Sequence, residues 1–205
     1  TRTTYFVIKG AALINTVGNI TENYLNLQAP GASTLKGMSQ LTIEALVRID
    51  KFDKFISTVM GIESTFLFRI GDAGVPDNQL QLATSSGNIT STSWQLPTNE
   101  WVHFAATYNS TDGAVDVYLN GVKKGETQYT GYRSAVNWAT SNFYVGKSYD
   151  DNRWLEADIC EVRVWNRVLA AEEINAKDHY YVVQTDSEGL VAYWKFDEGA
   201  GMVVE

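Results

Sequence analysis

The amino-acid sequence predicts an all-β protein built as a sandwich or a barrel, and three observations support this. Short runs of alternating apolar and polar residues recur along the chain. The joints between these runs are rich in Gly, Asn, Asp and Ser, which favour turns. Helical composition is confined to residues 167–174. Repeated short strands joined by polar turns are typical of sandwiches and barrels.

The clearest strand covers residues 41–49, where Ile43, Ala45, Val47 and Ile49 share one face of a half-buried strand. The polar residues of this run lie on the opposite face: Thr42, Glu44 and Arg48. Similar runs predict further strands at residues 5–8, 24–27, 66–70, 79–83, 101–108, 114–119, 143–145, 159–165 and 190–196.

Two local signals complete the predicted elements. Asn120-Gly121 predicts a two-residue hairpin, because a type I′ turn needs positive φ at both positions. Residues 167–174 are about two helical turns long and predict one short helical connection that needs packing to be stable. Residues 15–23 leave three alternatives open: an edge strand, a loop, or a connection from a preceding domain.

Composition limits the classes of partner. The 205 residues suit one domain, and 16 Lys+Arg against 24 Asp+Glu give a net charge of -8, which argues against nucleic acid and an anionic membrane surface. The single Cys160 cannot form a disulfide within the chain, and His103 and His179 leave little material for a transition-metal site. No apolar stretch approaches the roughly 18 residues of a membrane span. We therefore predict no cofactor, no metal and no membrane insertion by this segment.

Five segments, in order, resemble the laminin-G-like domain family of the concanavalin A-like lectin/glucanase superfamily, in its bacterial secreted and surface branch. They are LTIEALVR at 41–48, EWVHFAATY at 100–108, VYLNG at 117–121, FYVG at 143–146, and EVRVWNRVL at 161–169 followed by EEI at 172–174. Residues 190–199 also resemble a family segment. We expect a single domain over residues 1–205, with 1–22 as a connection from an upstream domain and 189–205 as a terminal strand. The start at Thr1 and the end at Glu205 suggest a piece of a longer, truncated polypeptide.

The resemblance implies a two-sheet antiparallel jelly-roll β-sandwich, with ligand sites on the concave face or in the loops at its rim. Its members include glycan-binding modules, adhesion modules, passive spacers and glycosidases, so the fold alone assigns no activity. It also implies an extracellular or cell-surface location, and a glycan or a cell-surface or extracellular protein as partner.

The enzymatic candidate is the pattern formed by Glu156, Asp158 and Glu161, which resembles the catalytic strand of retaining β-glucanases. Retention needs two carboxyl groups about 5–5.5 Å apart. In a regular strand Glu156 and Asp158 share a face and Glu161 points to the other, so catalysis would need a bulge near residues 159–160. We predict a regular strand and no catalysis.

The noncatalytic interpretation of this strand places its apolar and polar residues on different faces. Cys160, Val162 and Val164 would face inward as one apolar row, and Glu161 and Arg163 would lie outward and pair with neighbours. Cys160 then behaves as a small buried hydrophobic residue.

The best binding candidate is the loop at residues 147–154. Its predicted ligand-binding residues combine hydrogen-bond acceptors, a bidentate donor and aromatic rings, a mixture that suits sugar hydroxyls and the C–H face of a sugar: Tyr149, Asp150, Asp151, Asn152, Arg153 and Trp154. The alternative is a solvated loop whose Trp154 folds inward. Trp94 and Trp138 are further candidate platforms or packing residues.

Two other candidate sites receive negative predictions. His103 lies in an alternating strand without a nucleophile signature, which predicts a packed strand residue. The resemblance implies calcium near the final long strand, but the usual Asp is replaced by Cys160, and Asn23 stands near Tyr24 in place of another Asp. Since calcium prefers carboxylate oxygens, we predict no tight structural calcium there.

The sequence thus favours a noncatalytic carbohydrate-binding or adhesion module of a larger secreted or surface bacterial protein. Two alternatives remain: a structural or protein-interaction spacer without glycan affinity, and a retaining β-glycosidase that uses Glu156 and Glu161.

Overall fold

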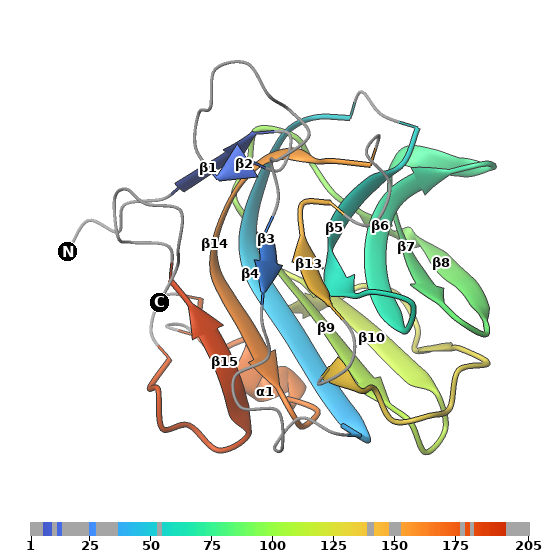
Figure 1. Ribbon diagram of the computed structural model, residues 1–205, viewed down its shortest axis with the longest axis vertical. Coiled ribbons are helices and arrows are strands. Elements are labelled where there is room, and N and C mark those ends of the chain that lie inside the picture. The colour runs from blue at the N-terminus through green and yellow to red at the C-terminus, as the bar shows by residue number, and fades with distance from the viewer. Residues whose placement is uncertain are drawn as a thin grey trace.

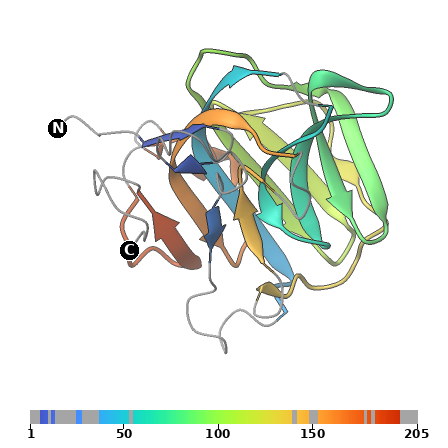
Figure 2. The same cartoon turned by 45° about the horizontal axis from the view of Figure 1, so that its top comes forward.

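Two sheets of antiparallel strands pack face to face in the computed structural model (Figure 1). The structure describes residues 6–9, 12–13, 25–27, 37–52, 55–138, 142–147, 153–176, 179–180 and 183–195. In Figures 1 and 2, the strands of the smaller sheet between residues 57 and 95 lie on the side of the molecule opposite the first and last strands of the larger sheet.

Within the described residues, the larger sheet has nine strands: β1 (Phe6–Lys9), β2 (Ala12–Leu13), β4 (Gln40–Lys51), β9 (Val102–Asn109), β10 (Ala114–Leu119), β11 (Val122–Lys123), β12 (Gln128–Tyr129), β14 (Glu156–Trp165) and β15 (Leu190–Trp194). Their order is β11-β10-β9-β4-β14-β1-β2, with β12 paired to β10 and β15 paired to β14. The smaller sheet has six strands in the part of the chain that the structure describes: β3 (Leu25–Leu27), β5 (Ser57–Ile62), β6 (Phe66–Asp72), β7 (Val75–Thr84), β8 (Gly87–Gln95) and β13 (Phe143–Val145). Their order is β3-β13-β5-β6-β7-β8, and the two sheets confirm the predicted jelly-roll sandwich.

The core lies between the sheets and contains the predicted inward face of β4. Aromatic rings join the two layers, since Phe68 of β6 meets Phe104 of β9 with ring centroids 5.2 Å apart. Trp94 and Trp138 are fully buried in this core. Both are therefore packing residues, and neither offers a face to a ligand.

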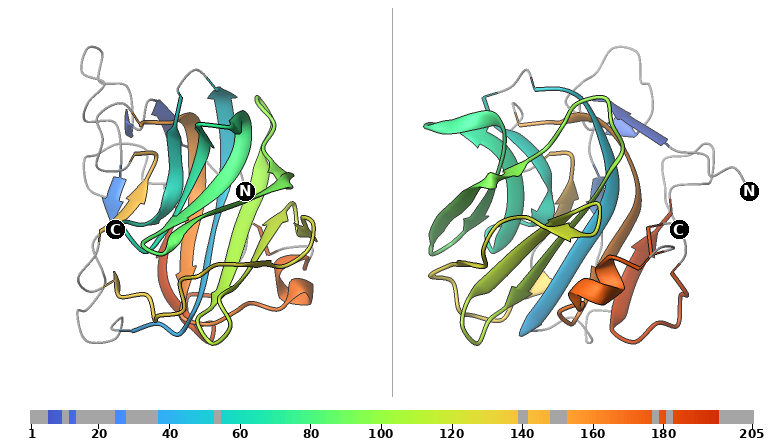
Figure 3. Two further views of the ribbon diagram at one scale, coloured as in Figure 1. Left: turned by 90° about the vertical axis from the view of Figure 1, so that its right-hand side faces the viewer. Right: turned by 180° about the vertical axis from the view of Figure 1, so that it is seen from behind.

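A second apolar cluster covers part of the outer face of the larger sheet. The short helix α1 (Ala171–Ile174) follows β14 and packs Ile174 against Trp165 and Tyr118 (Figure 3). Arg167 holds this connection through two hydrogen bonds to the Glu173 carboxylate, of 2.8 and 2.7 Å. The predicted helical connection is confirmed, although it is shorter than residues 167–174. No helix in the described ranges has the length and hydropathy needed to cross a membrane.

The hairpin between β10 and β11 has the predicted turn, with φ of 52° at Asn120 and 75° at Gly121. Positive φ at both positions is the signature of a type I′ turn. A side chain at Gly121 would also place its Cβ 2.6 Å from the Tyr180 hydroxyl oxygen. The turn therefore packs directly against the segment that follows α1.

Strand β14 contains a bulge at Glu161, so the prediction of a regular strand is wrong. Cys160 pairs with Leu46 and Arg163 pairs with Glu44, which leaves one extra residue on β14, and Glu161 has φ of 55°. Such an extra residue in the left-handed region defines a β-bulge. One consequence is that Cys160 shares the outer face with Leu46.

The bulge changes which side chains face the core. Val162 and Val164 point inward, as predicted, whereas Cys160 does not, so the predicted row of three is interrupted. The bulge also separates two pairing partners of β14. Strand β1 pairs with residues 157–159, and β15 pairs with residues 162–165 on the same edge.

Candidate functional site

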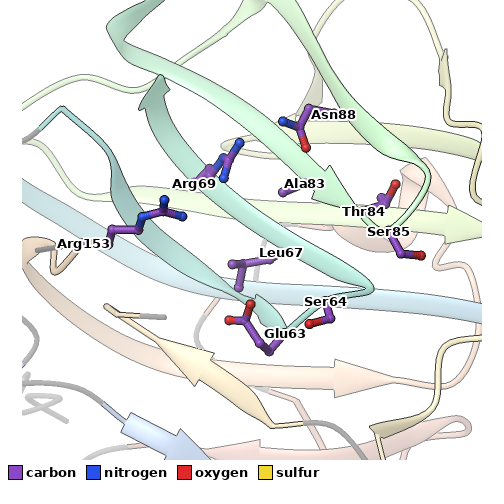
Figure 4. A pocket seen from close by; sticks show the side chains of 9 residues that line it. All are labelled: Glu63, Ser64, Leu67, Arg69, Ala83, Thr84, Ser85, Asn88 and Arg153. Atoms are coloured by element: carbon purple, nitrogen blue, oxygen red, sulfur yellow. The ribbon is translucent and has the colours of Figure 1, made fainter. Parts of the chain in front are cut away.

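A cavity of about 400 Å³ opens on the outer face of the six-stranded sheet (Figure 4). Alternation along β6 produces it: Phe66, Phe68 and Ile70 enter the core, so Leu67 and Arg69 point outward. Nine residues line the cavity: Glu63, Ser64, Leu67, Arg69, Ala83, Thr84, Ser85, Asn88 and Arg153. They come from the β5–β6 and β7–β8 turns, from β6, β7 and β8, and from the segment before β14.

Arg69 is held at the cavity by two neighbouring side chains. Its Nε donates to Gln81 Oε1 at 2.7 Å and its Nη2 donates to Asp72 Oδ2 at 2.6 Å. Asp72 is fixed in turn, because its Oδ1 accepts a hydrogen bond from the backbone N–H of Ala73 at 2.7 Å. A guanidinium has five N–H donors, so about three remain for a ligand. Arg69 is therefore a positioned donor whose rotamer is set before any ligand arrives.

Other polar groups around the cavity are available to a ligand. Among the described residues, the side chains of Ser64, Ser85 and Asn88 have no hydrogen-bond partner. Leu67 and Ala83 contribute apolar surface between them. Planar groups that offer two donors or acceptors at once, next to hydroxyls and a small apolar area, match the alternating O–H and C–H surface of a sugar.

The structure places the predicted loop residues in three different situations. Arg153 is half-buried and lines the cavity. Trp154 is 8% exposed and packs in the hydrophobic core, which is the inward-folded alternative. Tyr149, Asp150, Asp151 and Asn152 lie outside the described residues. Of the predicted loop residues that the structure describes, Arg153 lines the cavity and Trp154 does not.

A second polar cluster is buried on the outer face of the larger sheet, centred on Glu44. The Glu44 Oε2 accepts hydrogen bonds from His103 Nε2 at 3.0 Å and His179 Nε2 at 2.7 Å. Its Oε1 accepts from Trp165 Nε1 at 2.9 Å and from Arg163 Nη1 at 3.3 Å. Glu44 is fully buried, and this four-donor arrangement satisfies both of its oxygens.

Arg163 extends this cluster to the segment that covers the sheet. Its Nη2 donates to Glu161 Oε2 at 2.6 Å, and its Nη1 donates to the His179 carbonyl at 2.8 Å. The Tyr193 hydroxyl donates to Glu161, and the ring of Tyr193 lies 4.8 Å from the guanidinium. Burial, together with the hydrogen bond to Glu161, raises the pKa of Tyr193 to about 12. These contacts join β4, β9, β14, β15 and residues 179–180.

The electrostatics of the cluster keep Glu44 charged and His103 neutral. Burial alone would raise the pKa of Glu44, but hydrogen bonds from His103 and His179 outweigh it and hold that pKa well below its ordinary value. Burial lowers the pKa of His103, and the adjacent Glu44 offsets this only in part. The folded chain therefore keeps this arrangement at neutral pH and loses stability relative to the unfolded chain as the pH falls.

Glu44, His103 and His179 also place three metal-ligand atoms within 4.8 Å of one another. Their hydrogen bonding does not fit a metal. The His103 Nδ1 is buried without a partner among the described residues, so the ring hydrogen belongs on Nε2, which donates it to Glu44. A metal would need the lone pair of that same nitrogen, and a ligating histidine normally donates from its other nitrogen. The cluster is a structural network. The packed position of His103 and the pairing of Glu161 and Arg163 were predicted, whereas the convergence of these side chains around Glu44 was not.

The three candidate catalytic carboxylates are all engaged in ion pairs. Glu156 pairs with Lys51 at 3.4 Å, Asp158 with Arg48, and Glu161 with Arg163. The bulge brings Glu161 to the outer face, but only 4% of Glu161 is exposed. A glycosidase nucleophile or acid must reach its substrate.

Cys160 is fully buried and reduced, and burial raises the pKa of its thiol. A protonated thiol is a poor ligand for calcium. Asn23 lies outside the described residues, and the absence of a tight calcium site at this position stays a prediction.

The profile of the concanavalin A-like lectin/glucanases superfamily, laminin G type, matches residues 20–175. A comparison with curated protein sequences finds no match. Among solved structures, a Bacteroides ovatus protein provisionally assigned as carbohydrate-binding is 30% identical, with a TM-score of 0.72 over 88% of this chain. The chain spans 52% of that protein's length.

Two further structures share the fold at low sequence identity. The heptameric SAP-like pentraxin of Limulus polyphemus is 16% identical, with a TM-score of 0.60 over 89% of this chain and 84% of its own. Domain 4 of AbnA, a GH43 extracellular arabinanase of Geobacillus stearothermophilus, was solved with arabinotriose. It is 17% identical, with a TM-score of 0.55 over 84% of this chain and 85% of its own.

Proposed function

The chain belongs to the concanavalin A-like lectin/glucanases superfamily, and on that premise we propose that it is a noncatalytic carbohydrate-binding module of a larger protein. The similarity to the Bacteroides ovatus protein, of which this chain spans about half, favours a module within a longer chain. We further propose a bacterial protein that acts outside the cell or at its surface, where polymeric glycans are accessible.

The cavity on the six-stranded sheet is the observation that carries this proposal. It combines a positioned guanidinium at Arg69, a free amide at Asn88 and free hydroxyls at Ser64 and Ser85, around the apolar surface of Leu67. A volume of about 400 Å³ is within the usual range for small-molecule sites and accommodates a sugar or a short oligosaccharide. Ser64, Ser85 and Asn88 are exposed to solvent, so sugar hydroxyls can replace the water that otherwise solvates these groups.

The buried state of Glu161 favours binding over hydrolysis. Arg163 and Tyr193 both donate to its carboxylate, and β15 lies alongside. A retaining glycosidase would have to break these contacts before substrate could reach the carboxylate. Glu161 therefore has a structural role in this proposal, and the ligand binds in the cavity on the six-stranded sheet.

A glycan array probed with the 205-residue chain tests the proposal. We expect binding to one class of glycan, and Asn88→Ala should weaken it about two- to tenfold through the loss of neutral hydrogen bonds. Asn166→Ala is the matched control, because Asn166 is also exposed but follows β14 on the other sheet. Failure of the wild-type chain to bind any glycan, or equal weakening by both variants, would contradict the proposal.

A further inference from the structure

The charged groups at the cavity balance one another. Arg69 and Arg153 line it with two positive charges, and Glu63 lines it with one negative charge. Asp72 is not part of the lining, but its carboxylate lies 2.6 Å from Arg69 Nη2. Among the described residues these four formal charges sum to zero, so this part of the cavity combines many hydrogen-bond donors with balanced charge.

The ion pair between Asp72 and Arg69 is shielded from solvent. The side chain of Arg69 is 12% exposed and that of Asp72 is 21% exposed. Charges that are partly buried are screened by salt much less than charges in open solvent. The Asp72 carboxylate therefore attracts or repels any charged group that approaches Arg69, and it also attracts Arg69 itself.

This arrangement treats uncharged and acidic sugars differently. A hydroxyl oxygen can accept from the remaining N–H groups of Arg69 without disturbing Asp72. The carboxylate of a sugar acid would approach the same N–H groups while repelled by Asp72 behind them. The net charge of -8 on the whole chain adds repulsion of the same sign at longer range.

We propose that Asp72 determines the ligand class of the cavity, because its carboxylate neutralises Arg69 and makes the site select uncharged sugars over sugar acids. This inference rests on the proposed carbohydrate-binding function. Asp72 is a specificity-determining residue that acts through Arg69, which is the residue that contacts the sugar. Gln81 takes the other edge of the guanidinium and fixes its orientation for either ligand class.

Matched pairs of oligosaccharides test the inference. Within each pair, C6 is a hydroxymethyl group in one member and a carboxylate in the other. The probes are oligomers of galactose and galacturonic acid, of glucose and glucuronic acid, and of mannose and mannuronic acid. Isothermal titration at low salt measures the affinity ratio within each pair. For the wild-type chain we expect the uncharged member to bind more tightly.

The decisive variant is Asp72→Asn, which keeps the size and the Oδ1 acceptor but removes the charge. We expect it to shift the affinity ratio toward the sugar acid by about tenfold, and we expect added salt to reduce that shift only slightly because Asp72 is partly buried. Asp116→Asn is the matched control, since Asp116 is similarly exposed at 24% and pairs with Lys123 at 2.8 Å on the other sheet. This control should leave the ratio unchanged. Asp72→Ser serves as a second variant if Asp72→Asn does not fold.

The outcomes separate the inference from the function on which it rests. If no member of any pair or of the wider array binds the wild-type chain, the proposed function fails and this inference with it. If the wild-type chain prefers the sugar acids, carbohydrate binding stands and the role of Asp72 is refuted. The same conclusion follows if the Asp72 variants shift the ratio no more than Asp116→Asn does.

Discussion

Replacing Glu44 by glutamine tests whether the buried network on the outer face of the larger sheet stabilises the fold. The substitution keeps the shape of the side chain and removes its charge. It also replaces one carboxylate oxygen by an NH₂ group. This group faces either the Nε2 atoms of His103 and His179, which bonded Oε2, or the Trp165 and Arg163 donors, which bonded Oε1. Donors that were satisfied by Glu44 are then left opposite another donor.

The expected cost follows from the burial of the partners. Glu44 and Arg163 are both fully buried, and removing one partner of a buried ion pair costs about 3–5 kcal/mol. Arg163 keeps its hydrogen bond to Glu161 at 2.6 Å, so its charge stays partly compensated. We therefore expect a loss near the lower end, about 3 kcal/mol, which corresponds to roughly 6–12 °C in melting temperature for a domain of this size.

Urea denaturation followed by tryptophan fluorescence and by circular dichroism measures this loss at pH 7.5. Asp116→Asn removes one charge from a more exposed pair and should cost about 1 kcal/mol or less. If Glu44→Gln costs no more than this control, the interpretation of the network as a stabilising element is refuted.

Three other outcomes are expected. The unfolded chain takes up protons at His103 below about pH 6.5 and at Glu44 below about pH 4.5, whereas folding lowers both pKa values. The urea midpoint of unfolding should therefore fall from pH 7 to pH 4, and His103→Gln should flatten the upper part of that decline. Trp154→Ala should lower the free energy of unfolding by about 3–5 kcal/mol, because the ring packs in the core; a loss under about 1 kcal/mol would contradict this. Gly61→Ala should lower the free energy of unfolding by about 2–4 kcal/mol, because its Cβ would lie 2.2 Å from a backbone oxygen. Gly131→Ala is the control: its Cβ would have no contact nearer than 3.7 Å, so the loss in the same urea titration should be less than about 1 kcal/mol.

The fold could be predicted where apolar and polar residues alternate along a strand or where a turn needs particular residues. Strand β4 shows the alternation and Asn120-Gly121 the turn chemistry, although the prediction that β4 is half-buried is wrong, because Thr42 and Glu44 on its polar face are buried too. Strand β5 is buried on both faces and shows no alternation, whereas β8 is an edge strand rich in Ser and Thr, and both were missed. The bulge at Glu161 could not be predicted either, because the left-handed conformation is adopted there by a residue that carries a side chain.

The candidate site was less predictable, since it depends on strand order. Arg153 belongs to the predicted loop, but Arg69 and Asn88 come from strands of a sheet whose order the sequence does not reveal. The Glu44 network could not be predicted for the same reason, because its residues are far apart in the sequence. His103 and His179 are 76 positions apart, and only the folded chain brings both rings to one carboxylate oxygen.

The junction of β1 and β15 on one edge of β14 has a consequence for the order of folding. Strands β9 and β10 are joined by a short turn and can pair early, whereas β14 must bridge about a hundred residues to reach β4, and β1 must wait for β14. Until then Glu44 lies on a surface that is still in water. Pulse-labelling hydrogen exchange should therefore show amide protection of β9 and β10 before that of β14, and simultaneous protection of all three strands would contradict this order.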